Sequence, residues 1–356
     1  MTLVAAFKID GVPALLGDFL ITDNGKRTND FLPTMTKNDP KAPRSMPLAG
    51  AGRIAGWCRK ITKINDHFVV GFTGEMKAGT SLIRNLHRVF SDRKITKQEL
   101  EAFLFNINVP NKSSVELIGW ICEKRQLCFN WNGKNNKLKI VESSFAGSGA
   151  KHFRSLIERK LDEGGPHIKT AFERAKFVCV NRIGHIIADE LRTLNTLKNS
   201  YGFGGECMVW NGRSFVYIDN ITYSFYNVEF RANNVTTWGI VEVMCKYKDW
   251  GDHCVFEVTQ FDVCDVTNTY KPVVTYGHFV SSVLGSNAVE HVRLPNSFDY
   301  LFVNMSISIE ASGRNIYMNM VHVSENDENI VFKKDDNGIL FRPDVLKKRI
   351  PAEYFQ

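Results

Sequence analysis

The residues with the clearest potential for chemistry stand at the start of the chain, where Met1 is followed by Thr2. Threonine is small enough for the usual co-translational removal of an initiator methionine, which leaves a hydroxyl and a free α-amine on one residue. The ordinary pKa of that amine is about 8, and a nearby cation lowers it so that the amine can accept the hydroxyl proton. Thr2 is therefore a candidate nucleophile, although threonine at this position is by itself also an ordinary starting residue.

Three further segments carry groups that assist a nucleophile. The first runs from Thr2 to Asp18, the second from Arg59 to Gly74, and the third from Phe145 to Gly149. In this order they resemble the proteasome β-subunit branch of the N-terminal-nucleophile hydrolases, together with its bacterial relatives. In that family the mature chain begins with threonine in a strand, turns at a glycine and reaches an aspartate at the spacing of Asp18.

This resemblance implies a role for each residue. Lys60 matches the family's catalytic lysine, whose charge would lower the pKa of the Thr2 amine and stabilise negative charge at its hydroxyl. Asp18 would keep Lys60 charged and oriented, and the Gly74 amide would donate to the oxyanion. Ser148, in a Gly-Ser-Gly turn, would hydrogen-bond the Thr2 amine. The implied activity is cleavage of a peptide or other amide substrate through an acyl-enzyme on Thr2, without a cofactor or metal.

The sequence also departs from the family pattern. Leu20 stands where the family usually has an arginine, and Ser200 and Phe203 stand where it has an aspartate and a serine. The interval between Asp18 and the Lys60 segment is longer than in the family, so Lys37, inside the extra length, is the alternative lysine.

These departures leave other hypotheses open. One is a catalytically degenerate, proteasome-like scaffold that binds another protein through its C-terminal region. Another is a non-proteolytic acylase that uses the same nucleophile. Because proteasome-like domains commonly associate, a homo-oligomer is a further expectation.

The predicted elements around Thr2 and Asp18 are strands. Apolar runs at Leu3–Phe7 and Ala14–Thr22, joined at Asp10-Gly11, predict a hairpin whose strands are buried on both faces. Asn24–Gly52 lacks periodicity and is rich in Gly, Pro and polar residues, so it predicts a long irregular insertion that shapes substrate access.

The rest of the chain alternates between strand and helix patterns. Apolar residues at Leu82, Ile83, Leu86, Val89 and Phe90 predict one face of a helix, and Thr96 with Glu99 predicts a capping box. The remaining elements are strands at 59–64, 67–72, 115–122, 127–131, 138–145, 207–210 and 214–218, and helices at about 150–161 and 167–194. This order predicts an α+β fold, with a four-layer α/β/β/α sandwich over residues 1–222 and a β-rich C-terminal domain over 223–356.

Composition limits the other functional classes. The chain has 356 residues, 44% of them hydrophobic, and a net charge of +7 without a basic tract interleaved with aromatics, so nucleic-acid binding is not expected. No apolar run is long enough for a membrane span, and the eight cysteines show no zinc spacing. We therefore expect a cytoplasmic protein whose thiols are buried as small hydrophobes.

Overall fold

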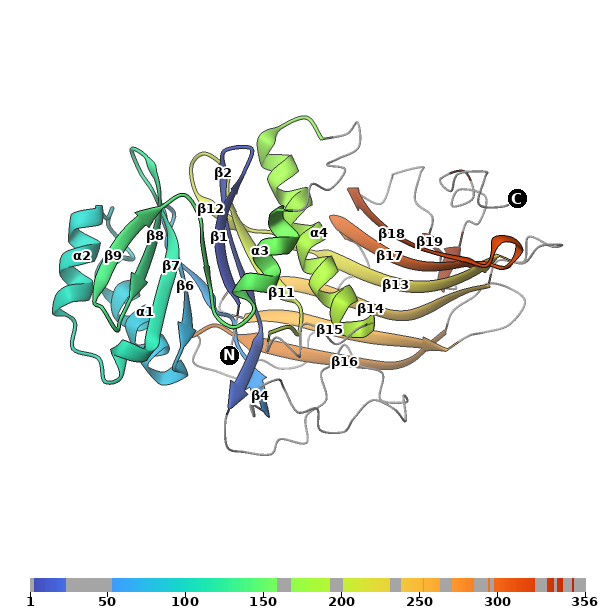
Figure 1. Ribbon diagram of the computed structural model, residues 1–356, viewed down its shortest axis with the longest axis horizontal. Coiled ribbons are helices and arrows are strands. Elements are labelled where there is room, and N and C mark those ends of the chain that lie inside the picture. Colours follow the sequence, from blue (N-terminus) through green and yellow to red (C-terminus); the bar gives the residue numbers. More distant parts are fainter. Residues whose placement is uncertain are drawn as a thin grey trace.

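The computed structural model describes residues 3–23, 53–158, 168–192, 201–230, 238–251, 253–262, 271–284, 294, 298–323, 332–335, 338–341 and 348. The fold is mixed α/β and consists mostly of strands, with four α-helices in these ranges (Figure 1). Thr2, Lys37, Ser200 and the expected insertion at 24–52 lie outside them.

The N-terminal hairpin forms the centre of the first sheet. β1 (Val4–Ile9) and β2 (Val12–Asp18) join at Asp10 and Gly11, whose φ angles of 49° and 81° are the positive values that a tight hairpin turn needs. Side chains of β1 alternate between two cores, with Val4 and Ala6 on one face and Ala5 and Phe7 on the other. The predicted burial on both faces is confirmed.

The first sheet has the strand order β10-β1-β2-β11-β12 and the second the order β5-β6-β7-β8-β9. The other strands of the first are β10 (Ser144–Ala146), β11 (Gly205–Trp210) and β12 (Phe215–Tyr217). Those of the second are β5 (Ile61–Asn65), β6 (Phe68–Gly74), β7 (Val115–Cys122), β8 (Gln126–Asn132) and β9 (Lys137–Val141). A short pair, β3 (Leu20–Asp23) with β4 (Arg53–Trp57), borders the first sheet.

The single strand predicted at 138–145 is wrong. The chain instead leaves the second sheet after β9 and enters the first sheet as β10. Glu142 and Ser143, both exposed and polar, form the bend between the two. Apolar periodicity on either side of the bend hid the change of sheet.

The two sheets face each other across an apolar layer to which both contribute, including Val4, Leu15, Val69 and Trp120. Glycines allow the close approach, since a Cβ on Gly71 would lie 2.5 Å from the Val4 side chain. Helices cover the outer faces. α1 (Met76–Phe90) and α2 (Lys97–Asn106) pack on the second sheet, and α3 (Ala150–Glu158) and α4 (Ala171–Arg192) pack on the first.

A helix is present in each segment where the sequence predicts one, although α4 begins at Ala171 and not at about 167. The capping box of α2 is present, with Thr96 and Glu99 each bonded to the other's backbone amide. The prediction that Val89 belongs to the buried face of α1 is wrong, because its side chain is 37% exposed. The hydrophobic spacing fitted Val89, but the sheet contacts the neighbouring stripe of Leu82, Leu86 and Phe90.

The C-terminal region forms a third sheet, with the order β16-β15-β14-β13-β17-β18. Its strands are β13 (Ile221–Phe230), β14 (Trp238–Trp250), β15 (His253–Asp262), β16 (Lys271–Ser281), β17 (Tyr300–Ile309) and β18 (Arg314–Val323). β13 and β17 pair in parallel, and the others are antiparallel. β19 (Phe332–Asp335) and β20 (Gly338–Phe341) form a separate antiparallel pair.

The third sheet shares a hydrophobic core with the first sheet and α4. In Figure 1, α4 lies between the first and third sheets, and one continuous hydrophobic cluster includes Leu16 of β2, Ile187 of α4 and Phe256 of β15. β13 begins at Ile221, close to the expected boundary at 222, but the shared core means that the two parts bury apolar surface against each other. Their division into two domains stays a prediction.

Candidate functional site

Asp18 and Lys60 meet in the interior, as the resemblance implies. The Lys60 ammonium lies 2.6 Å from Asp18 Oδ1, and the two side chains are 4% and 0% exposed. The same oxygen accepts the backbone amide of Leu3 at 2.8 Å, and Oδ2 accepts that of Gly202 at 2.9 Å. The carboxylate therefore connects the start of β1 to the lysine and to the segment before β11.

The local backbone fixes Lys60 in this position. It stands between β4 and β5, where its carbonyl accepts the amide of Phe72 in β6 at 3.2 Å. Its ammonium also donates to the Leu20 carbonyl, so two of its three N–H donors have partners in the described part of the chain. Burial lowers the pKa of Lys60 from its ordinary value, and the Asp18 carboxylate opposes that shift.

Gly74 ends β6, two residues after Phe72, and Glu75 caps the helix that follows. Its φ is +103°, and a Cβ there would lie 1.9 Å from the Ser114 carbonyl oxygen. Only glycine fits this turn from strand to helix. Gly74 is exposed to solvent.

Ser148 lies in the turn between β10 and α3, and its side chain is exposed. β10 pairs with β1 through Ala146 and Val4, so Ser148 follows a strand that is hydrogen-bonded to the start of the chain. Thr2 itself is outside the described residues, as is the alternative Lys37. The structure thus brings Asp18 and Lys60 together beside Leu3, whereas the position of the nucleophile stays a prediction.

Tyr201 and Phe203 lie in the segment before β11, and both contact residues of the neighbouring helices or their turns. Phe203 is fully buried with a φ of +61°, and its amide donates to the Glu190 carboxylate at 2.6 Å. Tyr201 packs against Gly149 and hydrogen-bonds His152. Sequence reasoning missed Glu190, Tyr201 and His152, because their importance depends on the packing of α3 and α4 beside this segment rather than on a motif.

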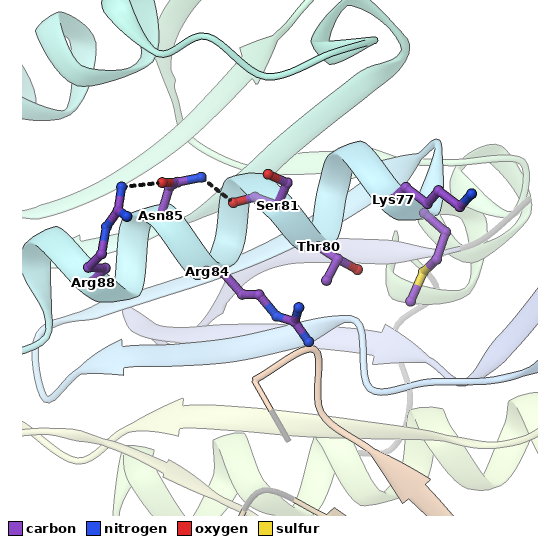
Figure 2. A pocket seen from close by; sticks show the side chains of 7 residues that line it. Lys77, Thr80, Ser81, Arg84, Asn85 and Arg88 are labelled. Carbon is purple, nitrogen blue, oxygen red and sulfur yellow. Dashed lines mark hydrogen bonds between the residues drawn. The ribbon is translucent and has the colours of Figure 1, made fainter. Parts of the chain in front are cut away.

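A groove of about 510 Å³ runs along α1 and begins at Met76, two residues after Gly74 (Figure 2). Its lining is Met76, Lys77, Thr80, Ser81, Arg84, Asn85 and Arg88, so it holds three cations and no carboxylate. Arg84 donates to the Val283 carbonyl at 2.9 Å and Arg88 to the Asn85 side chain at 2.6 Å. Within the described ranges, none of the three cations forms an ion pair.

Within those same ranges, no group of three or more His, Cys, Asp or Glu side chains is arranged to hold a metal ion. No helix there is both long and apolar enough to cross a membrane. Six cysteines have described side chains, and all of them are buried: Cys58, Cys122, Cys128, Cys179, Cys207 and Cys254. No known family model matches the sequence, and no curated protein matches it significantly.

Proposed function

We propose that the chain is an N-terminal-nucleophile amidohydrolase, with Thr2 as nucleophile after removal of Met1. The observation that carries the proposal is the shared oxygen of Asp18, which binds both the Lys60 ammonium and the amide of Leu3. The Leu3 amide is covalently bonded to the carbonyl of residue 2. A buried cation is therefore held close to the residue that the sequence singles out.

In the proposed reaction the Thr2 hydroxyl attacks a substrate amide carbonyl while the Thr2 amine takes its proton. Lys60 has one N–H donor not used within the described residues, and this donor stabilises the negative charge that forms at the hydroxyl oxygen. The Gly74 amide donates to the substrate oxyanion. The tetrahedral intermediate expels the amine product with the transferred proton, and water activated by the same amine then hydrolyses the ester.

The proposed substrates carry acidic groups near the scissile amide. The groove along α1 begins next to Gly74 and is lined by Lys77, Arg84 and Arg88. Like charges four residues apart on a helix, as in Arg84 and Arg88, destabilise it, and a bound carboxylate would relieve this repulsion. We expect Lys77→Gln and Arg88→Gln to reduce the preference for acidic over basic peptide amides about tenfold, an effect of about 1.4 kcal/mol, with Arg93→Gln, outside the groove, as control.

The packing of helices on sheet, sheet on sheet, and sheet on helices supports the four-layer sandwich of this superfamily over residues 1–222. A cytoplasmic location and assembly into homo-oligomers belong to the same proposal. The location is expected from the composition of the sequence and the assembly from the resemblance.

The test combines mass and labelling. Intact mass of the purified chain is expected to show loss of Met1, and a β-lactone or epoxyketone is expected to add one equivalent at Thr2. Thr2→Ala abolishes labelling, whereas Thr2→Ser retains it, because serine keeps the hydroxyl and the amine. A chain that retains Met1 in its active form, or a Thr2→Ala variant with full amidase activity, contradicts the mechanism.

A second candidate is a non-catalytic scaffold that binds a protein through its third sheet. Phe203 favours it, since a buried aromatic ring stands where the family has a hydrogen-bonding serine. In that case neither the β-lactone nor the epoxyketone labels the wild-type chain, and its N-terminus stays blocked.

A further inference from the structure

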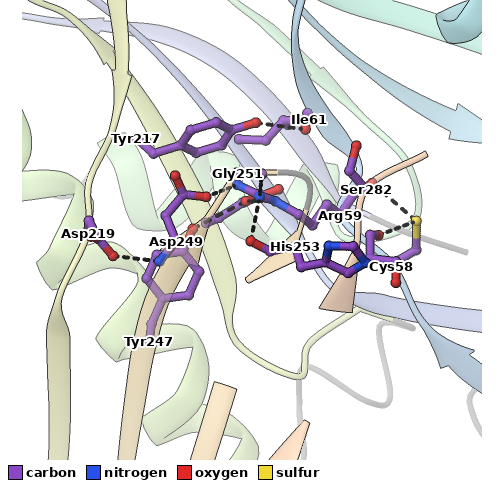
Figure 3. Close-up of polar contacts among 12 residues, drawn as sticks. Cys58, Arg59, Ile61, Tyr217, Asp219, Tyr247, Asp249, Gly251, His253 and Ser282 are labelled. Atoms are coloured by element: carbon purple, nitrogen blue, oxygen red, sulfur yellow. Dashed lines mark hydrogen bonds and ion pairs between the residues drawn. The ribbon is translucent and has the colours of Figure 1, made fainter. Parts of the chain in front are cut away.

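The third sheet reaches the proposed site through the residue next to Lys60. Arg59 is 1% exposed, and its guanidinium lies among residues of β11 and of the C-terminal sheet (Figure 3). Nε lies 2.7 Å from Glu206 Oε2 and Nη2 lies 2.8 Å from Asp249 Oδ1. Nη1 donates to the carbonyls of Gly251 and His253, at 2.5 and 3.1 Å. Nε and Nη1 thus form hydrogen bonds, whereas the contact between Nη2 and Asp249 is an ion pair without hydrogen-bond geometry.

The backbone of the same residue is also bound to the third sheet. The Arg59 amide donates to the carbonyl of Ser281, at the end of β16, at 3.1 Å, and Arg59 forms an isolated parallel bridge with Ser282. The thiol of Cys58 points to the same Ser281 carbonyl at 3.4 Å. The guanidinium also lies 4.3 Å from the centre of the Tyr217 ring.

Lys60, one peptide bond further on, turns the opposite way and binds Asp18. Two adjacent side chains therefore face two different regions, Arg59 the C-terminal sheet and Lys60 the N-terminal hairpin. Because the peptide unit between them is planar and rigid, a displacement at Arg59 is transmitted to Lys60. A shift of about 1 Å in a catalytic group is enough to lower a rate a hundredfold.

We propose that Arg59 is a positioning residue through which the C-terminal sheet holds the Lys60 ammonium against the Asp18 carboxylate. This inference rests on the proposed function, since it assigns the third sheet to the hydrolase site. The third sheet then forms part of the catalytic unit rather than a separable binding module. The forked guanidinium suits this task, because it contacts two carboxylates and two carbonyls at once, whereas an ammonium has only three N–H donors.

The test uses the full chain with Arg59→Lys, which keeps the positive charge and removes the fork. Asp249→Asn is the second variant, in case Arg59→Lys does not fold, since the Asp249 side chain is 22% exposed and lies at the edge of the cluster. Leu100→Ala is the control, because it destabilises the chain by a cavity in α2, away from Arg59.

The first measurement is inactivation by a β-lactone. We expect Arg59→Lys to lower the maximal inactivation rate at least tenfold with little change in the half-saturating concentration, because lysine placement affects the reaction and not the binding groove. Leu100→Ala, where folded, keeps the wild-type rate. A wild-type rate in Arg59→Lys overturns the inference.

The second measurement does not depend on Thr2. Reductive methylation of the native protein, followed by peptide mass mapping, reports the protection of the buried Lys60 ammonium. We expect Arg59→Lys to accelerate methylation of Lys60 at least tenfold relative to Leu100→Ala. Equal protection in the two variants overturns the positioning role. If Arg59→Lys loses the protection of Lys60 and the wild-type chain is not labelled by the lactone, the positioning role is supported and the proposed function is refuted. The two failures are therefore distinguishable.

Discussion

Replacing Lys60 by methionine tests the buried pair at the centre of the candidate site. The change preserves much of the side-chain volume and leaves the Asp18 carboxylate fully buried and without the ammonium, while it still accepts from the amides of Leu3 and Gly202. Two unit charges 2.6 Å apart attract by about 6 kcal/mol at an effective dielectric constant of about 20. Since the variant no longer has to desolvate an ammonium, the net loss is smaller. We expect the free energy of unfolding to fall by about 3–5 kcal/mol, the usual cost of removing one partner of a buried ion pair.

The assay is urea denaturation followed by tryptophan fluorescence, with Asp18→Asn and the double variant measured alongside. Asp18→Asn leaves the ammonium buried and places an amide donor among groups that themselves donate. The sum of the losses of unfolding free energy in the two single variants is therefore expected to exceed the loss in the double variant by a coupling energy of about 2–3 kcal/mol. If Lys60→Met lies within about 1 kcal/mol of the wild type, the pair is not a buried ion pair and the reasoning fails.

Three further predictions concern stability. Gly74→Ala is expected to cost more than about 3 kcal/mol, since its Cβ would lie 1.9 Å from Ser114 O, whereas Gly212→Ala, with a φ of +95° but no neighbour within 4 Å, is expected to cost only about 1–2 kcal/mol in the same urea titration; equal costs contradict the steric argument. Burial raises the pKa of Glu206 from 4.5 to about 7, so the folded state binds the proton more tightly than the unfolded state does. This stabilisation is lost as the pH rises from 4.5 to about 7, and the free energy of unfolding measured over that range should decrease by about 3 kcal/mol in the wild type but not in Glu206→Gln. Thr96→Ala removes the capping box of α2 and should cost about 1 kcal/mol by thermal or urea unfolding; no measurable change would mean that this helix end is not limiting.

Local patterns in the sequence were sufficient for most of the elements. The turn at Asp10-Gly11, the capping box at Thr96 and the strand at Val115–Cys122 follow from short-range chemistry, and the structure confirms them. The error at 138–145 has a clear cause. Apolar periodicity reports that residues are buried but not which sheet they join, and only the pairing of β10 with β1 settles that.

The candidate site divides in the same way. Sequence spacing and resemblance singled out Asp18 and Lys60, and their meeting at 2.6 Å agrees with that pairing. Arg59 carried no signal beyond its place next to Lys60, because the hydrogen-bond partners of its side chain come from 147 to 194 residues further along the chain. The charge of the groove along α1 also depends on which face of the helix the sheet leaves uncovered.

By itself, the sequence determined most of the strands and helices, most of their apolar faces, and which residue types could assist a nucleophile at residue 2. Only the tertiary structure decided that the C-terminal sheet binds Arg59, next to Lys60, and that it shares a hydrophobic core with α4. The physical reason is that backbone conformation and amphipathic pattern are encoded over a few residues, whereas the partner of a buried charge is fixed by chain segments that meet only when the whole core is packed.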